Sequence, residues 1–281
     1  MKINISNIGP AGVFDRKSDI IFGLYHSLVS LGHQVTIGLN KFEIGCVNLV
    51  IGSDIIASSP KAVDQLISNK IEYIVYEVEN FNGRTVNYRT KFNLDNYHRF
   101  LRHANYIITP YMYNLPALTR VVGKANVKYC RWGFHPKMIN NEFSKSKDPD
   151  YQALFFGMTK GSRVEKIRKL SMKLGKKFRT LNEVDPFTSR AYFISNCKWG
   201  LSLSYGETDD FVNPFRLFSM VANGLPVLAD HKIDEDGYLD VCITHSFEDL
   251  IEKISEEPDH SGSVSEKLYE NRLEENLRFA F

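Results

Sequence analysis

Short apolar runs alternate with amphipathic segments along most of the 281-residue chain, and this alternation constrains the fold more strongly than any other feature. Residues 2–9 have the pattern of a strand, and a glycine-containing turn follows them. Ser18 or Asp19 is then expected to cap a helix that runs to Gly32, before a second strand at 34–39. This order of strand, glycine turn, helix and strand is typical of a Rossmann-like opening.

The alternation continues and predicts two α/β domains. Further strand patterns in the first domain occur at 47–51, 71–78, 106–109 and 127–130, with helical patterns at 60–68, 97–103 and 115–122. The polar segment 145–149 has no strand pattern, so we place the linker there. We expect an N-terminal Rossmann-like domain over 1–145, a C-terminal one over 150–260, and a closing helix within 261–281 that packs back on the N-terminal domain.

The predicted second domain opens with an apolar strand, a glycine turn and a basic helix. The strand covers 153–156, the turn 157–162 and the helix 163–174. Further elements are strands at 178–181, 199–203 and 241–244, and helices at 189–196, 247–254 and 266–279. The same strand–helix alternation therefore governs both halves of the chain.

Residues 204–230 contain a helix with clear start and stop signals. Asn213 is a suitable N-cap, and Pro214 suits the first helical position because the N–H that proline lacks would have no helical partner there. Gly224 suits the left-handed position after the helix, and residues 225–229 have the pattern of a short buried strand.

Two helices of the second domain begin with an arginine. Arg216 lies in the first turn of its helix, where the helix dipole disfavours a cation unless an anion is also present. Arg163 begins the basic helix after the 157–162 turn. Both turns should lie at the carboxyl edge of one open sheet and could cradle a diphosphate. Alternatively, Arg216 forms an ion pair with a nearby acid, namely Glu207, Asp209 or Asp210.

Composition is that of a soluble globular protein. The hydrophobic content is 43% and the charged content 24%, and no apolar run approaches the roughly 18 residues that a membrane span needs. The N-terminus has no signal-peptide layout. Four cysteines are scattered without metal or disulfide spacing, which favours reduced thiols in a cytosolic protein: Cys46, Cys130, Cys197 and Cys242.

A net charge of +2 conceals an uneven distribution of charge. Residues 84–137 hold ten lysines and arginines against one acid, Asp95, and residues 160–179 hold nine against Glu165. Such segregation favours a face that meets polyanions, although solvated surface helices give the same pattern.

The chain, with its two predicted Rossmann-like halves, resembles GT-B glycosyltransferases. The resemblance rests on Gly32-His33 before the second strand and on the pattern R-x-F-x-M-x-x-x-G-x-P-V-L from Arg216 to Leu228. The order of motifs is also similar to that of the phage DNA β-glucosyltransferases along most of the chain. The matching pieces are MKINISNIG, residues 73–77, FFGMTKGSRVEKI and DDFVNPFRLFSMVANGLPVL.

This resemblance implies an α/β protein of the GT-B class, with two Rossmann-like domains facing across a cleft. It implies that Arg163 and Arg216 hold the diphosphate of a UDP-sugar on the C-terminal domain, and that Glu77 is the general base. Many GT-B enzymes have a glutamate that binds the nucleotide ribose, and this chain has Ser219 at that position. The Ser219 hydroxyl can still bond a ribose hydroxyl, but without charge assistance.

Three other residues complete the predicted nucleotide-sugar site. Gly157 and Asn213 form the two turns described above, and Gly12 lies in the first glycine turn. Gly12 either allows a ligand to approach the backbone or is a simple turn residue.

The position of Glu77 also favours it as the general base. It ends an apolar strand at the carboxyl edge of the first sheet, where an inverting transfer needs a carboxylate to take the proton of the acceptor hydroxyl. Glu79 is the rival, because it points to the same side of the strand. Alternatively, Glu77 has a structural role, with its carboxylate bonded to Arg84 or Arg89.

The basic segment also carries the predicted acceptor contacts. Aromatic residues interleave with its arginines and either belong to the core or contact bases or sugar rings of an acceptor. We select Arg84, Arg89 and Tyr111 as acceptor-binding residues.

The sequence therefore predicts a cytoplasmic, inverting glycosyltransferase of a bacterial cell or a phage-infected host. The favoured acceptor is 5-hydroxymethylcytosine in double-stranded DNA, and the alternative acceptor is a surface polysaccharide or lipid-linked glycan. No metal site is predicted, no cofactor should be tightly bound, and a divalent metal should not be required for binding, because Asp234-Glu-Asp236 lies in a loop and not at a strand end. A hypothesis of another class is an inactive GT-B-like module that binds nucleic acid.

Overall fold

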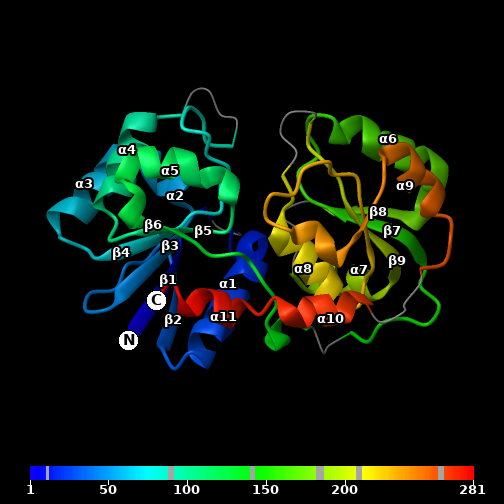
Figure 1. The fold of residues 1–281 in the computed structure, drawn as a ribbon, viewed down its shortest axis with the longest axis horizontal. Helices are drawn as coiled ribbons and strands as arrows, with labels where there is room; N and C mark the ends of the chain where they lie inside the picture. Colours follow the sequence, from blue (N-terminus) through cyan, green and yellow to red (C-terminus); the bar gives the residue numbers. More distant parts are fainter. Residues whose placement is uncertain (11–12, 88–91, 140–142, 182–186, 207–210, 259–262) are drawn as a thin grey trace. The chain divides into compact units, whose positions relative to one another are not determined.

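The chain forms two compact α/β units, each built on its own parallel sheet (Figure 1). The computed structural model describes residues 1–10, 13–87, 92–139, 143–181, 187–206, 211–258 and 263–281. The first unit comprises Met1–Phe14, Leu24–Trp132 and Leu273–Phe281, and the second comprises Asp15–Gly23 and Gly133–Arg272. The contacts thus divide the chain at Trp132, whereas the sequence places the linker at 145–149.

The sheet of the first unit has the strand order β2-β1-β3-β4-β5-β6, with every pairing parallel. A parallel sheet needs a crossover between successive strands, and the amphipathic segments provide it. The strands are β1 (Lys2–Asn7), β2 (Gln34–Leu39), β3 (Val47–Ile51), β4 (Tyr73–Tyr76), β5 (Ile107–Thr109) and β6 (Val127–Tyr129). The helices are α1 (Val13–Ser30), of which residues 15–23 belong to the second unit, α2 (Ser53–Ala57), α3 (Pro60–Ser68), α4 (Leu94–His103), α5 (Leu115–Val122) and α11 (Leu273–Arg278).

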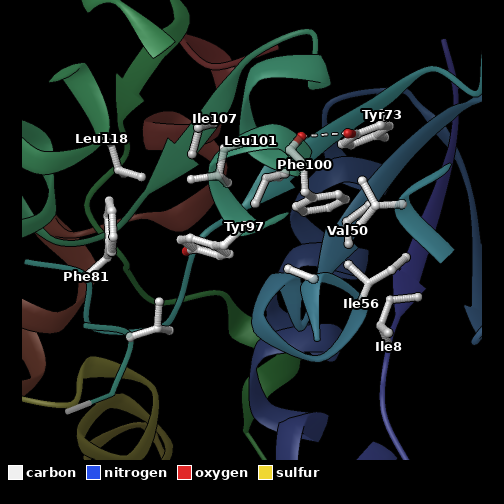
Figure 2. Packing of buried hydrophobic residues seen from close by; sticks show 14 of the residues in the cluster. Ile8, Val50, Ile56, Tyr73, Phe81, Tyr97, Phe100, Leu101, Ile107 and Leu118 are labelled. Carbon is white, nitrogen blue, oxygen red and sulfur yellow. Dashed lines mark hydrogen bonds between the residues drawn. The ribbon is translucent and has the colours of Figure 1, made fainter. Parts of the chain in front are cut away.

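A hydrophobic core fills the space between this sheet and helices α2 to α5 (Figure 2). Tyr73 and Phe100 stack with ring centroids 4.9 Å apart, and the Tyr73 hydroxyl donates to the Phe100 carbonyl at 2.6 Å. Tyr97 is fully buried in the same cluster and packs edge-on against Phe81. Tyr97 and Phe100, two aromatic residues of the basic segment, therefore supply core packing here, whereas Arg102 of α4 and Arg120 of α5 are exposed.

The sheet of the second unit has the order β11-β10-β9-β7-β8, again with parallel pairing throughout. The strands are β7 (Tyr151–Phe156), β8 (Phe178–Leu181), β9 (Cys197–Ser202), β10 (Val227–Ala229) and β11 (Ile243–Thr244). The helices are α6 (Arg163–Leu174), α7 (Phe187–Ser195), α8 (Pro214–Ala222), α9 (Phe247–Lys253) and α10 (Ser263–Glu270). Strand β7 has β8 on one side and β9 on the other, so the order of strands reverses there. Ligands of open α/β sheets bind at such a switch point.

The first and the last predicted helices differ most from the structure. α1 begins at Val13, so the prediction that Ser18 or Asp19 caps it is wrong. Both residues lie inside the helix and are buried, because their polar groups have partners elsewhere in the second unit. The predicted closing helix at 266–279 is two helices, α10 and α11, and α11 belongs to the first unit.

The predicted strand at 71–78 is also shorter in the structure. β4 ends at Tyr76, so Glu77 is the first residue after it. The Glu77 N–H still donates to the Ile108 carbonyl at 2.7 Å, which fixes the backbone of this residue at the sheet edge. None of the helices in the described part of the chain combines the length and hydropathy that crossing a membrane requires.

Candidate functional site

The candidate donor site lies where β7 ends in the second unit. Gly157 follows β7 with φ +148°, a backbone conformation that residues other than glycine rarely adopt. A Cβ placed on Gly157 would lie 2.1 Å from Nη1 of Arg216. The guanidinium of Arg216 therefore packs directly on the backbone at the carboxyl end of the strand, and glycine is required for this approach.

Arg216 is positioned by the start of α8. Asn213 has an extended backbone, and its side-chain oxygen accepts a hydrogen bond from the Arg216 N–H at 3.1 Å, so it is the N-cap. Pro214 is the first helical residue, and Gly224 has a left-handed φ of 71° after the helix. The predicted start and stop signals of this helix are confirmed.

Arg163 approaches the same end of β7 from α6. Its Nε donates to the Leu203 carbonyl at 2.8 Å, and its guanidinium lies 5.7 Å from the ring centroid of Phe155 and 5.3 Å from that of Tyr205. Ser162, just before α6, donates its hydroxyl to the Tyr205 carbonyl at 2.8 Å and does not cap the helix. The N-terminus of α6 therefore keeps the positive potential that attracts anions.

A third arginine, Arg190 in α7, reaches this place and was not identified from the sequence. Its guanidinium lies 5.9 Å from the ring centroid of Phe156, and only 6% of the residue is exposed. Nη1 forms a 2.8 Å ion pair with Asp19, and Nη2 donates to Ser18 Oγ at 2.7 Å. We call Arg163, Arg190 and Arg216 the arginine cluster, because each contacts the end of β7 or the turn after it.

Ser219 lies one turn after Arg216, and its hydroxyl is engaged inside the protein. It donates to Asp19 at 3.3 Å, and 8% of the residue is exposed. Burial raises the pKa of Asp19, while the charge of Arg190, the bond from Ser219 and the charge of Arg216 lower it. The structure thus places a buried carboxylate next to the position where the resemblance implies a glutamate.

The structure brings five of the six predicted donor residues into one region of the second unit. Gly157, Arg163, Asn213 and Arg216 meet around the end of β7, and Ser219 lies in the same helix as Arg216. Their role in donor binding stays a prediction. Gly12 and the three acids proposed as alternative partners of Arg216 lie outside the described residues.

A cavity of about 750 Å³ lies beside Arg163, at the carboxyl ends of β9, β10 and β11. Ser162, Lys166, Ser204 and Asp230 are among its lining residues. Lys166 and the buried Asp230 form an ion pair of 2.5 Å there. The volume is within the range of small-molecule pockets.

In the first unit, Glu77 is fully buried at the carboxyl edge of the sheet. Its Oε2 accepts hydrogen bonds from the hydroxyls of Ser53 at 2.6 Å and Tyr97 at 2.5 Å, and its Oε1 accepts the Glu79 N–H at 2.9 Å. Ser53 begins α2 directly after β3, and Tyr97 belongs to α4. Burial raises the pKa of Glu77 to about 7, although the bonds from Ser53 and Tyr97 lower it.

Glu79, the rival carboxylate, and the predicted acceptor residues that the structure describes differ in how far they are exposed. Glu79 is half-buried and accepts a hydrogen bond from Asn87 Nδ2. Arg84 is exposed, whereas Tyr111 is only 3% exposed, so the structure does not present the Tyr111 ring to an acceptor. Arg89 lies outside the described residues. Among the described residues, no three His, Cys, Asp or Glu side chains gather as a set of metal ligands.

The raised pKa of Glu77 predicts a pH dependence of stability. Between about pH 4.5 and pH 7 the folded protein holds a proton on Glu77 that the unfolded chain loses, so the free energy of unfolding falls as pH rises. We expect this group to account for up to about 3 kcal/mol of the fall. In Glu77→Gln, urea unfolding at pH 5 and pH 8 should give a smaller difference than in the wild type. An unchanged difference would show that Glu77 does not titrate in this range.

Comparisons with known proteins identify the fold. The sequence matches no protein-family model and no curated protein. A solved structure described as an α-glucosyltransferase in complex with UDP and a 13-mer DNA with a central A:G mismatch is similar over 97% of this chain and 96% of its own, with a TM-score of 0.60 and 10% identity. A structure of an α-glucosyltransferase in complex with UDP covers 98% and 94%, with a TM-score of 0.56 and 12% identity.

The apo form of the lipopolysaccharide outer core galactosyltransferase WaaB is also similar. It matches 100% of this chain and 99% of its own, with a TM-score of 0.51 and 9% identity. Together with the two parallel sheets, these likenesses show that the chain has the GT-B fold of two Rossmann-like domains.

Proposed function

We propose that the protein is a glycosyltransferase that moves a sugar from a nucleoside-diphosphate donor to a hydroxyl acceptor. The observation that carries this proposal is the packing of Arg216 on Gly157 at the switch point of the second sheet, with Arg163 contacting the same turn. The N-termini of α6 and α8 begin beside these arginines. Two cations and two helix N-termini at one edge provide the charge that a diphosphate needs.

UDP is the favoured nucleotide. Two structures with the same fold as this chain are described as complexes with UDP. The cavity beside Arg163 offers room for part of a donor. Because the leaving group of the transfer is the nucleoside diphosphate, Arg163 and Arg216 would stabilise the charge that develops when its bond to the sugar breaks.

Double-stranded DNA that contains 5-hydroxymethylcytosine is the favoured acceptor. Arg102 in α4, Arg120 in α5 and Lys124 just after α5 are exposed in the first unit. Arg120 also approaches the Gly83–Arg84 turn, since a Cβ on Gly83 would lie 3.2 Å from Arg120 Nη2. These basic side chains form a surface suited to backbone phosphates. One structure of the same fold is described as a complex with DNA.

A glycan acceptor is the second candidate. The WaaB structure, which has the same fold, is described as a lipopolysaccharide outer core galactosyltransferase. Exposed arginines also suit the acidic groups of a surface glycan. The two acceptors can be separated only by assaying transfer.

Glu77 is the proposed general base of an inverting transfer. In such a step the carboxylate takes the proton of the acceptor hydroxyl while the sugar passes to that oxygen and the diphosphate leaves. A pKa of about 7 suits this role, because such a carboxylate accepts a proton readily at neutral pH. Since Glu77 is fully buried, the acceptor hydroxyl would have to replace the Ser53 or Tyr97 hydroxyl at Oε2.

Donor binding tests the first part of the proposal. Arg216→Ala and Arg163→Ala should each weaken UDP binding by about 1.5–3 kcal/mol, as expected for charge-assisted contacts. Isothermal calorimetry with UDP measures the effect. Arg179→Ala is the matched control, because Arg179 stacks on Tyr151 in the same sheet, 4.5 Å from the ring centroid. If the wild type does not bind UDP, the chain is better described as an inactive GT-B-like module.

Transfer to defined acceptors tests the second part. The protein is incubated with UDP-sugars and with duplex DNA that contains either cytosine or 5-hydroxymethylcytosine, and the DNA is digested to nucleosides for mass spectrometry. We expect a hexose or pentose on the hydroxymethylated base only. Transfer to a lipopolysaccharide core glycan without transfer to DNA would favour the second candidate.

Replacing Glu77 tests the mechanism. Glu77→Gln keeps the size of the side chain but removes the basic carboxylate, so turnover should fall by about 10² to 10⁴ with little change in UDP affinity. Glu79→Gln is the control on the neighbouring carboxylate. If Glu79→Gln loses turnover and Glu77→Gln keeps it within about threefold, the base is Glu79.

A further inference from the structure

A buried carboxylate lies within the arginine cluster of the second unit. Asp19 is 8% exposed, forms the 2.8 Å ion pair with Arg190 Nη1, and accepts the Ser219 hydroxyl at 3.3 Å. Ser18, its neighbour in α1, accepts a hydrogen bond from Nη2 of the same arginine. Residues Asp15–Gly23 of α1 cluster with the second unit, so these are contacts within that unit.

The charge of Asp19 acts on more than Arg190. The charge of Arg216 also lowers the pKa of Asp19, against the larger effect of burial, which raises it. Arg163, Arg190 and Arg216 all contact the segment from Phe155 to Met158. Three guanidinium groups gathered at one strand end repel one another, and the repulsion is strongest where water is excluded. With Asp19 included, the net charge of these four side chains is +2.

We propose that Asp19 is the internal counter-ion of the arginine cluster, and that it stabilises the donor-free protein at the expense of affinity for the diphosphate. This inference rests on the proposed function, because it assumes that the cluster binds the donor diphosphate. Arg190 is the direct partner of Asp19 and acts as a positioning residue. Through this pair, the protein sets how strongly the remaining positive charge attracts an anionic ligand.

Removing the carboxylate should tighten anion binding. In Asp19→Asn the cluster loses its negative charge, so inorganic pyrophosphate and UDP should each bind about three- to twentyfold more tightly in calorimetry. The ligand-free variant should also unfold at a lower temperature than the wild type, because the buried Arg190 loses its ion pair with Asp19. Both ligands should respond alike, since the effect acts on the diphosphate.

Arg190 provides a test with the opposite sign. Arg190→Gln leaves Asp19 to interact with Arg216, so both ligands should bind about three- to twentyfold more weakly. Arg190→Lys keeps the charge and should bind both ligands within about threefold of the wild type. If the Asp19–Arg190 pair only stabilised the fold, Asp19→Asn and Arg190→Gln would change the ligand affinity in the same direction, because each variant breaks the same contact.

Several outcomes would overturn the inference. These are unchanged or weaker pyrophosphate binding in a folded Asp19→Asn, or equal affinities of Arg190→Lys and Arg190→Gln. The second comparison stands even if Asp19→Asn does not fold. Glu257→Gln, which removes an exposed carboxylate paired with Lys198, is the charge control and should change neither affinity. Failure of the wild type to bind either ligand would instead refute the proposed function.

Discussion

The approach of Arg216 to the backbone of Gly157 is the constraint on which the candidate site depends. A side chain at position 157 would occupy the place of the guanidinium, so the end of β7 has to be glycine. A second glycine supports the same geometry, because a Cβ on Gly200 in β9 would lie 2.6 Å from the Met220 sulfur of α8. The tight packing of α8 on β9 and the N-cap at Asn213 together fix the backbone position of Arg216. The cation is thus held by rigid elements of the sheet edge.

The two units bury their carboxylates in different ways. Asp19 forms an ion pair with Arg190 inside the second unit, where burial raises the pKa of the carboxyl and the charge of the arginine opposes that effect. Glu77 receives hydroxyl and N–H hydrogen bonds, and burial dominates its pKa. This difference suits one carboxylate that adjusts the charge of a binding site and another that exchanges a proton near neutral pH.

The sequence predicted the fold where local signals and global topology agree. The Asn213-Pro214 start, the Gly224 stop and the strand-helix alternation of both sheets depend on neighbouring residues, and the structure confirms them. The contact between Arg190 and Asp19 was missed because it joins positions 171 residues apart, which no local pattern reveals. Ser18 and Asp19 are good capping residues by type, and this misled the prediction of the helix start. The burial of Tyr111 likewise depends on packing, which interleaved aromatic and basic residues do not disclose.

Hydrogen–deuterium exchange with and without UDP would test the central claim most directly, namely that a nucleoside diphosphate binds where β7 ends. The account predicts slower exchange of backbone amides at 157–164, and at 215–217 in the first turn of α8, because the ligand covers both helix starts. Protection confined to the first unit, or binding of UDP without protection of either segment, would contradict it.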